Sequence, residues 1–286
     1  MLTKEAYFCA MLLLGQVNTL RASRRSDPGY YLIDDEENEV LLPNKYVPDN
    51  LKAGKAIEVF LYKDSEDRWV ATTIYPVVML YGYAYLEMKM NSGFGSFFDW
   101  GLEKDLLVPK NQLDRKLEEG EKAVVYVYLD EKSERLVGTT KIKQTLSKEE
   151  VELKVGEEVD CLLFQENELG FLCVVNDYYQ GMLYKNELSE TREVGDRLTA
   201  YVNRIREDNK IDLRDRQVGL GAIDEESQRI LNKIKEEGGY IKLTDKSSPE
   251  LIQKHLGISK KLFKKSIGRL YKEKLITLEK DGIRLN

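Results

Sequence analysis

Histidine and long apolar runs are scarce in this sequence of 286 residues, and each scarcity excludes a class of protein. The single histidine, His255, lies on an amphipathic helical segment, where a packed or exposed helix residue is its ordinary role. No Ser–His–Asp or Cys–His set for nucleophilic catalysis can be assembled around it. No apolar run approaches the roughly 18 residues that a membrane span requires, so we expect no membrane partner.

Cysteine is also rare. The three cysteines, Cys9, Cys161 and Cys173, are an odd number without CxxC spacing, which argues against a disulfide framework and a zinc site. Cys161 and Cys173 lie in apolar strand-like runs, where we expect small buried thiols. The N-terminal segment lacks an A-x-A-like cleavage site, so we expect no signal peptide, an extension over residues 1–10 and a cytoplasmic protein.

Motifs that hold phosphates or metal ions are missing as well. The pair Gly93 and Gly95 lacks the third glycine and the strand-to-helix setting of a dinucleotide fingerprint, and there is no P-loop. The acidic run Asp34–Glu37 offers carboxylates to Mg²⁺, but it lies in a turn, where solvated charge is far commoner. We therefore expect no metal, no cofactor and no catalytic residue, and hence a protein that is not an enzyme.

Charge is unevenly distributed along the chain. The formal net charge is −6, yet residues 225–286 carry about six more basic than acidic side chains, which leaves residues 1–224 strongly acidic. An acidic majority does not forbid nucleic-acid binding. It restricts any binding surface to local patches or to the basic C-terminal segment.

Internal repetition is the strongest feature that is present. The segment Val59–Thr73 resembles Val125–Thr140, and Glu39–Val47 resembles Leu106–Leu113, both at an offset of about 66 residues. A more divergent third copy starts near Val155. This repetition predicts three consecutive copies of one small domain.

Each copy contains the patterns of five short strands. Alternation of apolar and polar residues in Ala56–Tyr62, Val124–Leu129 and Leu198–Ile205 predicts half-buried antiparallel strands. A polar hairpin follows each of them, KDSEDR, DEKSER or REDNK, with turn-forming residues. Five strands within about 65 residues fit a small closed or nearly closed barrel, which removes exposed sheet edges.

The stretch Ser92–Leu107 of the second copy predicts a strand that enters at Phe94 and bends at Gly95. A glycine inside a strand marks a bulge or a tight bend, which a small barrel needs at its corners. A second strand follows directly.

Side chains alternate between the two faces of a strand, so Phe98 and Trp100 share one face and Phe97 and Asp99 share the other. Asp99 is costly to bury unpaired, so its face should be the outer one. Phe97 is then exposed beside Phe94, on a surface where bases can stack. The alternative is that both phenylalanines belong to the core.

The three copies resemble the S1-type RNA-binding domain, an OB-fold barrel. The family pattern is F-G-A-F, then G-L-V-H-x-S-E-L, then an acidic residue shortly before an arginine in the last hairpin. The second copy is most similar, and its matching positions are Phe94-Gly95-Ser96-Phe97, Leu106-Leu107-Val108-Pro109, Asp130 and Arg135. The first copy has Pro28-Gly29-Tyr30-Tyr31, Leu41-Leu42-Pro43, Asp64 and Arg68, and the third has Leu169-Gly170-Phe171-Leu172, Gly181–Leu188, Arg206 and Lys210.

In S1-type domains the aromatic residues stack on bases and the arginine contacts phosphate. The family histidine that contacts RNA is replaced by Pro43, Pro109 and Tyr184. The resemblance implies that these residues bind RNA: Phe94, Phe97 and Arg135, then Tyr31 and Arg68, then Tyr184, Lys185, Arg206 and Lys210. The third copy lacks both usual aromatics, and its alternative role is that of a structural spacer.

The composition changes after Gly219–Gly221, where helical patterns replace strand patterns. Serine residues at helix N-caps and the turn-forming pair Asp281–Gly282 mark the boundaries of the new elements. Their order is that of a winged helix-turn-helix domain. The predicted elements are a helix over Glu225–Glu237, a strand over Tyr240–Leu243, a helix capped by Ser248, a helix over Lys260–Lys274 capped by Ser259, and a hairpin of Ile276–Glu279 with Ile283–Leu285.

The helix Lys260–Lys274 stands in the recognition position of such a domain and carries a basic face. Cations contact phosphates readily, but the face contains no Asn or Gln to read base edges, which favours non-specific or RNA contact over operator recognition. The alternative is a solvated lysine face on a domain that docks a partner. The basic residues are Lys260, Lys261, Lys264, Lys265, Arg269 and Lys272.

The whole order of domains resembles the conserved virulence factor B family of bacterial RNA-binding proteins. The motifs that carry the resemblance are Val17-Asn18-Thr19-Leu20, Glu39–Pro48, Phe97–Pro109, Gly181–Glu187, Ile205–Leu213, Asp245–Glu250 and Ser259–Lys272. The resemblance implies a cytosolic RNA-binding protein that affects gene expression after transcription. The barrel aromatics, with Arg and Lys nearby, favour single-stranded RNA as the ligand. The alternative is a DNA-binding regulator that uses the winged helix.

These features predict a multidomain, mainly β protein with three tandem S1-like OB-fold barrels followed by an α+β winged helix-turn-helix domain. The expected domain boundaries are residues 11–76, 77–145, 150–217 and 224–286.

Overall fold

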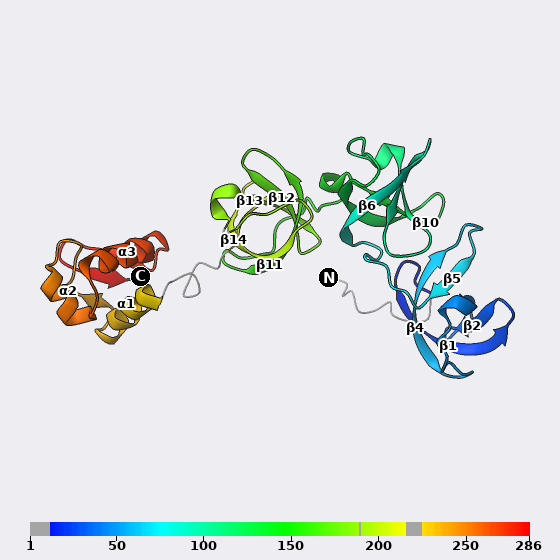
Figure 1. Cartoon of the computed structure of the whole chain (residues 1–286), viewed down its shortest axis with the longest axis horizontal. Helices are drawn as coiled ribbons and strands as arrows, with labels where there is room; N and C mark the ends of the chain where they lie inside the picture. The colour runs from blue at the N-terminus through cyan, green and yellow to red at the C-terminus, as the bar shows by residue number, and fades with distance from the viewer. Residues whose placement is uncertain (1–11, 189, 216–224) are drawn as a thin grey trace. The chain divides into compact units, whose positions relative to one another are not determined.

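The computed structural model describes residues 12–188, 190–215 and 225–286, which form four sheets in sequence order (Figure 1). The predicted fold class is confirmed, since barrel-like sheets precede a small helical domain of winged type. Cys9 and the expected extension over residues 1–10 lie outside the described residues, as do the boundaries expected at residues 11, 217 and 224. The four domain boundaries stay predictions.

The first sheet is a closed barrel with the strand order β1-β2-β3-β5-β4. Neighbouring strands are antiparallel except β3 and β5, which pair in parallel at Leu41 and Val70. Leu32, Leu42 and Leu61 are fully buried inside it. The elements are β1 (Val17–Ser26), β2 (Gly29–Ile33), β3 (Glu39–Pro43), η1 (Asn44–Tyr46), β4 (Ala56–Lys63) and β5 (Trp69–Thr72).

The second sheet has the order β10-β9-β6-β7-β8, and its edge strands β8 and β10 contact each other, so the barrel is nearly closed. Met88, Phe98 and Val125 fill its interior. The elements are β6 (Tyr83–Asn91), β7 (Gly95–Asp99), β8 (Leu106–Pro109), η2 (Lys110–Gln112), β9 (Lys122–Asp130), β10 (Arg135–Thr139) and η3 (Ile142–Gln144).

The third sheet is a closed barrel with the order β11-β12-β13-β15-β14. Cys161 and Cys173 are free, fully buried thiols, as predicted. A hydrogen bond with Cys173 and burial hold the pKa of Cys161 well above its ordinary value. The elements are β11 (Glu158–Glu166), β12 (Gly170–Val175), β13 (Tyr179–Tyr184), η4 (Lys185–Glu187), β14 (Arg197–Ile205) and β15 (Ile211–Arg214).

The three barrels repeat one backbone feature, which supports the repetition predicted from the sequence. The first strand of each barrel carries a register shift, and a glycine in the left-handed region donates its N–H to the carbonyl just before that shift. The three glycine φ angles are 83°, 87° and 99°. The donor and acceptor residues are Gly54 and Ala22, Gly120 and Met88, and Gly195 and Leu163.

The predicted role of Gly95 is wrong in one respect. The bulge lies on β6 between Met88 and Met90, and Gly95 is the first residue of β7. Phe94 belongs to the preceding turn and not to the strand. A Cβ at Gly95 would lie 2.4 Å from the carbonyl oxygen of Val108 on β8, so glycine is required here by the close approach of two backbones.

The C-terminal domain has the predicted winged order, with the sheet β16-β18-β17. Ser248 and Ser259 accept hydrogen bonds from backbone N–H groups as helix N-caps, as predicted. Phe263, Ile267 and Leu270 are buried in its core. The elements are α1 (Glu225–Glu236), β16 (Tyr240–Ile241), α2 (Pro249–Leu256), α3 (Lys260–Lys272), β17 (Ile276–Leu278) and β18 (Ile283–Leu285), so α3 ends two residues and β16 ends two residues before the predicted bounds.

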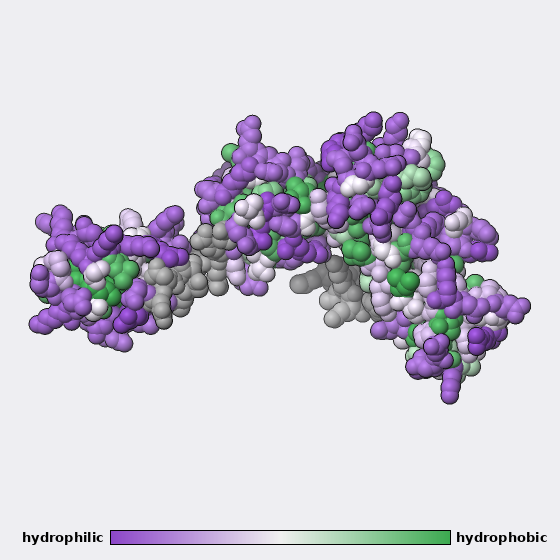
Figure 2. All heavy atoms as spheres, in the orientation of Figure 1, coloured by the Kyte–Doolittle hydropathy of each residue, from purple (hydrophilic) through white to green (hydrophobic). Residues whose placement is uncertain are grey.

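The surface is mainly polar. Figure 2 shows hydrophilic residues over most of the face that it draws, with hydrophobic residues in small patches between them. Over the described ranges, no helix combines the length and the apolar character that crossing a membrane would need.

The close approach at Gly95 leads to a stability prediction. Replacing Gly95 with Ala should lower the free energy of unfolding by about 1–3 kcal/mol, because the new methyl group forces β7 and β8 apart. Urea denaturation of the full chain measures this loss.

Gly93 provides the matched control two residues away, because a Cβ there meets no atom within 4 Å. The substitution Gly93→Ala should therefore change the free energy of unfolding by less than about 0.5 kcal/mol. Equal costs at the two positions would contradict the steric role of Gly95.

Candidate nucleic-acid interface

The strand β7 presents the two faces that its alternation predicts. Phe98 and Trp100 are buried, whereas Phe97 and Asp99 are partly exposed on the outer face. Phe94 is 62% exposed, so the alternative in which both phenylalanines are core residues is excluded. Asp99 accepts the backbone N–H of Gly101 and pairs with Lys89 at 3.3 Å, which lowers its pKa and accounts for its outward position.

Phe94 and Phe97 form one aromatic pair. Their ring centroids are 5.8 Å apart and the rings are nearly perpendicular, at 89°. The turn that carries Phe94 is held by the hydroxyl of Ser92, which donates to the carbonyl of Gly95 at 2.7 Å. The N–H of Lys110 donates to the carbonyl of Phe94 at 2.8 Å, so an exposed ring is displayed from an ordered turn.

A cavity of about 250 Å³ brings the predicted residues of the second copy together. Phe94 and Phe97 line it beside Arg135, and Lys63 and Lys104 complete its basic side. Three separate parts of the second barrel therefore contribute to one site, and β4 of the first barrel supplies Lys63.

Arg135 does not pair with the acidic residue of its own hairpin. Its Nε and Nη2 atoms donate to the two carboxylate oxygens of Asp67, each at 2.6 Å, whereas Asp130 accepts from Ser133. The guanidinium holds the pKa of Asp67 below its usual range, and the carboxylate raises the pKa of Arg135. Arg135 remains 44% exposed, so part of the guanidinium is open to a ligand.

The hairpin between β4 and β5 forms one wall of this site. Lys104 donates its ammonium group to the carbonyls of Lys63 and Asp64, at 3.0 and 2.8 Å. Burial lowers the pKa of Lys104. Phe60 of β4 meets Trp100 edge to face, with centroids 5.9 Å apart. The sequence patterns indicated only a polar turn here, because a contact between two repeats leaves no local pattern.

The first copy places its candidate residues differently. The guanidinium of Arg24 lies 3.8 Å from the centroid of the Tyr31 ring, so this cation covers one face of the tyrosine. Arg68 is bound by Asp64 at 2.7 Å and by Glu66 at 2.8 Å. Tyr31 and Arg68 each have a partner within their own barrel.

The third copy brings Tyr184 and Arg206 together. Arg206 donates to the Tyr184 hydroxyl at 2.6 Å and to the carboxylate of Asp212 at 2.8 Å. Lys210 pairs with Asp208 at 2.8 Å, and Lys185 begins η4. The carboxylates of Asp212 and Asp208 balance Arg206 and Lys210, which weakens the attraction of these two cations for phosphate.

The basic face predicted for the C-terminal domain is present on α3. Lys261, Lys264, Lys265 and Lys272 are exposed, and Lys260 and Arg269 are half-buried. Lys264 lies 3.8 Å from the carboxylate of Asp245, at the limit of an ion pair. This face therefore carries a local excess of positive charge.

The acidic run Asp34–Glu37 builds a turn. The carboxylate of Asp34 accepts the backbone N–H groups of Glu36 and Asn38, both at 2.9 Å. Within the described ranges, no three acidic, histidine or cysteine side chains gather as a metal site would require. His255 is exposed on α2, in agreement with its expected ordinary role.

Comparison with known proteins identifies the domains. Residues 14–74 and 82–141 match the family model of the S1 domain, and residues 228–285 match that of the CvfB-like winged helix domain. Both are nucleic-acid-binding domain types.

Two curated relatives match along most of their length. The uncharacterized protein YitL of Bacillus subtilis strain 168 is 26% identical over 265 residues, which cover 90% of this chain and 89% of that protein. A conserved virulence factor B of Staphylococcus saprophyticus is 23% identical over 282 residues, which cover 96% and 94%. A solved multidomain protein with nucleic acid binding domains from Streptococcus pneumoniae TIGR4 is 21% identical, with a TM-score of 0.46 over 96% of this chain and 98% of that one.

The Asp67–Arg135 pair predicts a pH effect. Replacing Arg135 with Gln should raise the pKa of Asp67 toward its ordinary value of 3.8, as measured by carbon NMR of the carboxyl groups. Because the folded-state pKa is lowered, the pair stabilises the fold above the unfolded-state pKa, and this contribution is lost as the pH falls through the folded-state pKa.

The first barrel provides the control. Arg68→Gln should raise the pKa of Asp64, whose carboxylate Arg68 binds, and leave Asp67 unchanged. A pKa of Asp67 that does not move in Arg135→Gln would show that the two side chains do not pair in solution.

Proposed function

We propose that this chain, which belongs to the conserved virulence factor B family of S1 and winged-helix proteins, binds single-stranded RNA without acting as an enzyme. One observation carries the proposal. The exposed ring of Phe94 stands beside Phe97 and Arg135 in a single cavity of the second S1 domain. Aromatic rings next to cations are the arrangement that OB-fold proteins use for single strands.

The chemistry of this cavity suits bases and phosphates together. Every base has a flat π-face, and its stacking on an aromatic side chain contributes about 1–3 kcal/mol. A guanidinium has five N–H donors. On Arg135 the Nε and Nη2 atoms donate to Asp67, so the remaining N–H groups on the exposed edge can donate to a phosphate oxygen. Stacking and phosphate contact do not discriminate strongly between bases, so we expect modest sequence preference.

The other domains add affinity more than specificity. The guanidinium of Arg24 covers one face of the Tyr31 ring, and Arg206 is bound by Asp212. We therefore expect the first and third barrels to contact the RNA strand less strongly than the second. The lysines of α3 attract phosphates of the same strand, and linkage within one chain raises their effective concentration. By binding an RNA in this way, the protein would regulate gene expression after transcription.

Phe94 provides the sharpest test of the binding face, because its exposed ring contributes little to the core. The substitution Phe94→Ala should weaken binding of a single-stranded RNA by roughly 5- to 140-fold, the loss of one stacked base. Fluorescence anisotropy of a labelled oligonucleotide measures the dissociation constant.

The matched control is Leu169→Ala. Leu169 precedes Gly170 in the third barrel as Phe94 precedes Gly95 in the second, and it is equally exposed at 66%, but it has no ring. This substitution should leave RNA affinity unchanged. A Phe94→Ala variant that binds like its parent would remove the basis of the proposal.

The basic face of α3 favours a second candidate function, a DNA-binding regulator that places α3 on duplex DNA. Competition between duplex DNA and single-stranded RNA at physiological salt separates the two functions. We expect RNA to compete better, and a clear duplex preference that is lost on deletion of residues 225–286 would support the DNA-binding regulator.

The same face predicts a salt effect. Replacing Lys264 and Lys265 with Gln should reduce the slope of log affinity against log salt by about 1.4, if each contacts one phosphate of a single strand. Lys235→Gln with Lys242→Gln removes the same charge elsewhere in the domain and should leave the slope unchanged. Equal slopes in both double variants would exclude α3 from the interface.

A further inference from the structure

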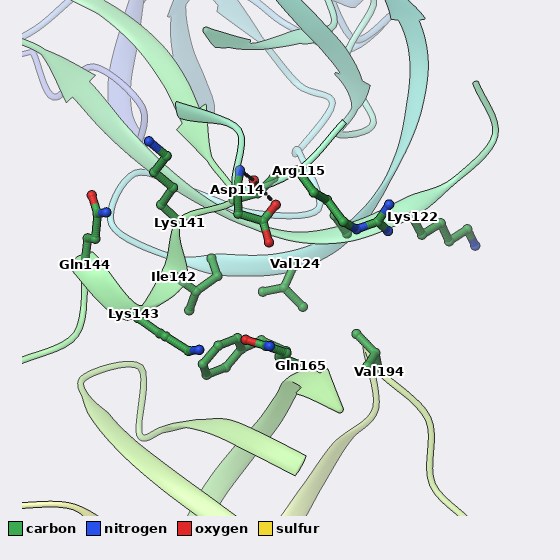
Figure 3. Close-up of a pocket in the computed structure, with 13 residues that line it drawn as sticks. Asp114, Arg115, Lys122, Val124, Lys141, Ile142, Lys143, Gln144, Gln165 and Val194 are labelled. Atoms are coloured by element: carbon green, nitrogen blue, oxygen red, sulfur yellow. Dashed lines mark hydrogen bonds between the residues drawn. The ribbon is translucent and has the colours of Figure 1, made fainter. Parts of the chain in front are cut away.

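A second cavity lies beside η3, outside the face that carries Phe94. Its volume is about 330 Å³, and it is lined by residues of β9 and η3 together with Phe164 and Gln165 of β11. We call it the η3 pocket. Figure 3 shows the apolar side chains of Val124 and Ile142 directed into it.

Basic side chains surround the η3 pocket. Arg115, Lys122, Lys141 and Lys143 line it, whereas Asp114 is its acidic lining residue and its carboxylate accepts the hydroxyl of Thr140 at 2.7 Å. Lys122, Lys141 and Lys143 form no ion pair within residues 12–188, 190–215 and 225–286, and Arg115 pairs with Glu121. The pocket therefore has uncompensated positive charge.

The directions of these side chains suit an extended ligand. In Figure 3 the side chain of Lys143 extends across the pocket toward Gln165, whereas Lys141 and Lys122 extend outward on opposite sides. A strand that crosses the pocket would place one nucleotide inside and its neighbouring phosphates near the two outward ammonium groups. The long lysine stems leave these groups free to follow a phosphate.

The pocket also offers surfaces for a base. Its volume lies in the usual range for small-ligand cavities, and its floor is apolar. Phe164 lies at the register shift of β11 and is only partly buried, so part of its ring faces the cavity that it lines. The amide of Gln165 can donate and accept hydrogen bonds at a base edge.

A basic path connects this pocket with the Phe94 face. Arg115 lines both the η3 pocket and another opening of about 510 Å³. That opening is also lined by Lys110, Lys116 and the two ends of the Phe94 turn, Ser92 and Gly95. Cationic side chains thus continue along the second barrel from one site to the other.

We infer that the η3 pocket is a second nucleotide-binding site, which holds one phosphorylated nucleotide of the RNA strand that stacks on Phe94 and Phe97. Lys143 and Gln165 contact the nucleotide inside the pocket, Phe164 stacks on its base, and Lys122 and Lys141 bind the adjacent phosphates. This inference rests on the proposed RNA-binding function. It adds the path of the RNA strand, from the Phe94 face along the second barrel to the η3 pocket.

Oligonucleotide length tests the inference. A uridine tetramer is long enough for the Phe94 face of one OB-fold, whereas a uridine 15-mer is long enough to reach the η3 pocket as well. The double substitution Lys141→Gln with Lys143→Gln should lower the affinity for the 15-mer roughly tenfold. It should also reduce the slope of log affinity against log salt for the 15-mer by about 1.4, and leave the affinity for the tetramer unchanged. Phe164→Leu, which keeps the apolar contact but removes the ring, should lower the affinity for the 15-mer and leave that for the tetramer unchanged.

The control is Lys52→Gln with Lys55→Gln, which removes the same charge from exposed positions on the first barrel and should change neither affinity. If the Lys141 and Lys143 double variant binds the 15-mer like its parent, or weakens both lengths equally, the η3 pocket is not a nucleotide site. Failure of the proposed function is recognised separately, because Phe94→Ala would then leave both lengths unaffected.

Discussion

A backbone hydrogen bond beside a bulge is the constraint on which each barrel depends. In the second barrel the N–H of Gly120 donates to the carbonyl of Met88, and the N–H of Met88 donates to the carbonyl of Glu121, so backbone pairing between β6 and the segment before β9 reaches the residue just before the register shift. The same reciprocal pair occurs in the first and third barrels, at Gly54 and at Gly195. This pairing holds β6 in register, and β7 pairs with β6 on both sides of the shift. Because side chains alternate with a period of two, a slip of one residue would turn Phe97 inward and expose Phe98.

The three barrels share this frame but differ in how their hairpin cations are used. Arg68 is engaged by Asp64 of its own hairpin, and Arg206 is engaged by Asp212 of the adjacent strand. Arg135 is engaged by Asp67, which belongs to the preceding repeat. The second barrel alone combines a partly exposed guanidinium with two outer phenylalanines in one cavity among the described residues. The candidate binding activity is therefore concentrated in the middle of the three repeats, and the acidic hairpin of its neighbour limits how strongly Arg135 attracts an anion.

Local patterns predicted the parts of the fold that depend on neighbours in sequence. The alternation in β7 predicted which rings are outside, Ser248 and Ser259 were correctly predicted as helix caps, and the basic face of α3 follows from its helical period. The bend assigned to Gly95 was wrong, because a glycine in a strand has the same local signature whether it permits a bulge or the approach of another backbone. Only the position of β8, whose Val108 carbonyl faces Gly95, distinguishes the two.

The sequence by itself determined the repeats, the strand faces and the winged domain, because these follow from periodicity and turn chemistry over a few residues. The tertiary structure alone decided which charges meet. It placed Asp67 against Arg135, Lys104 against the carbonyls of the preceding repeat, and Lys143 across the η3 pocket from Gln165. Such contacts join residues that are far apart in the chain, so no local pattern encodes them. The physical reason is that a surface cation takes its partner from whatever carboxylate or carbonyl the packing of the barrels brings within hydrogen-bond distance.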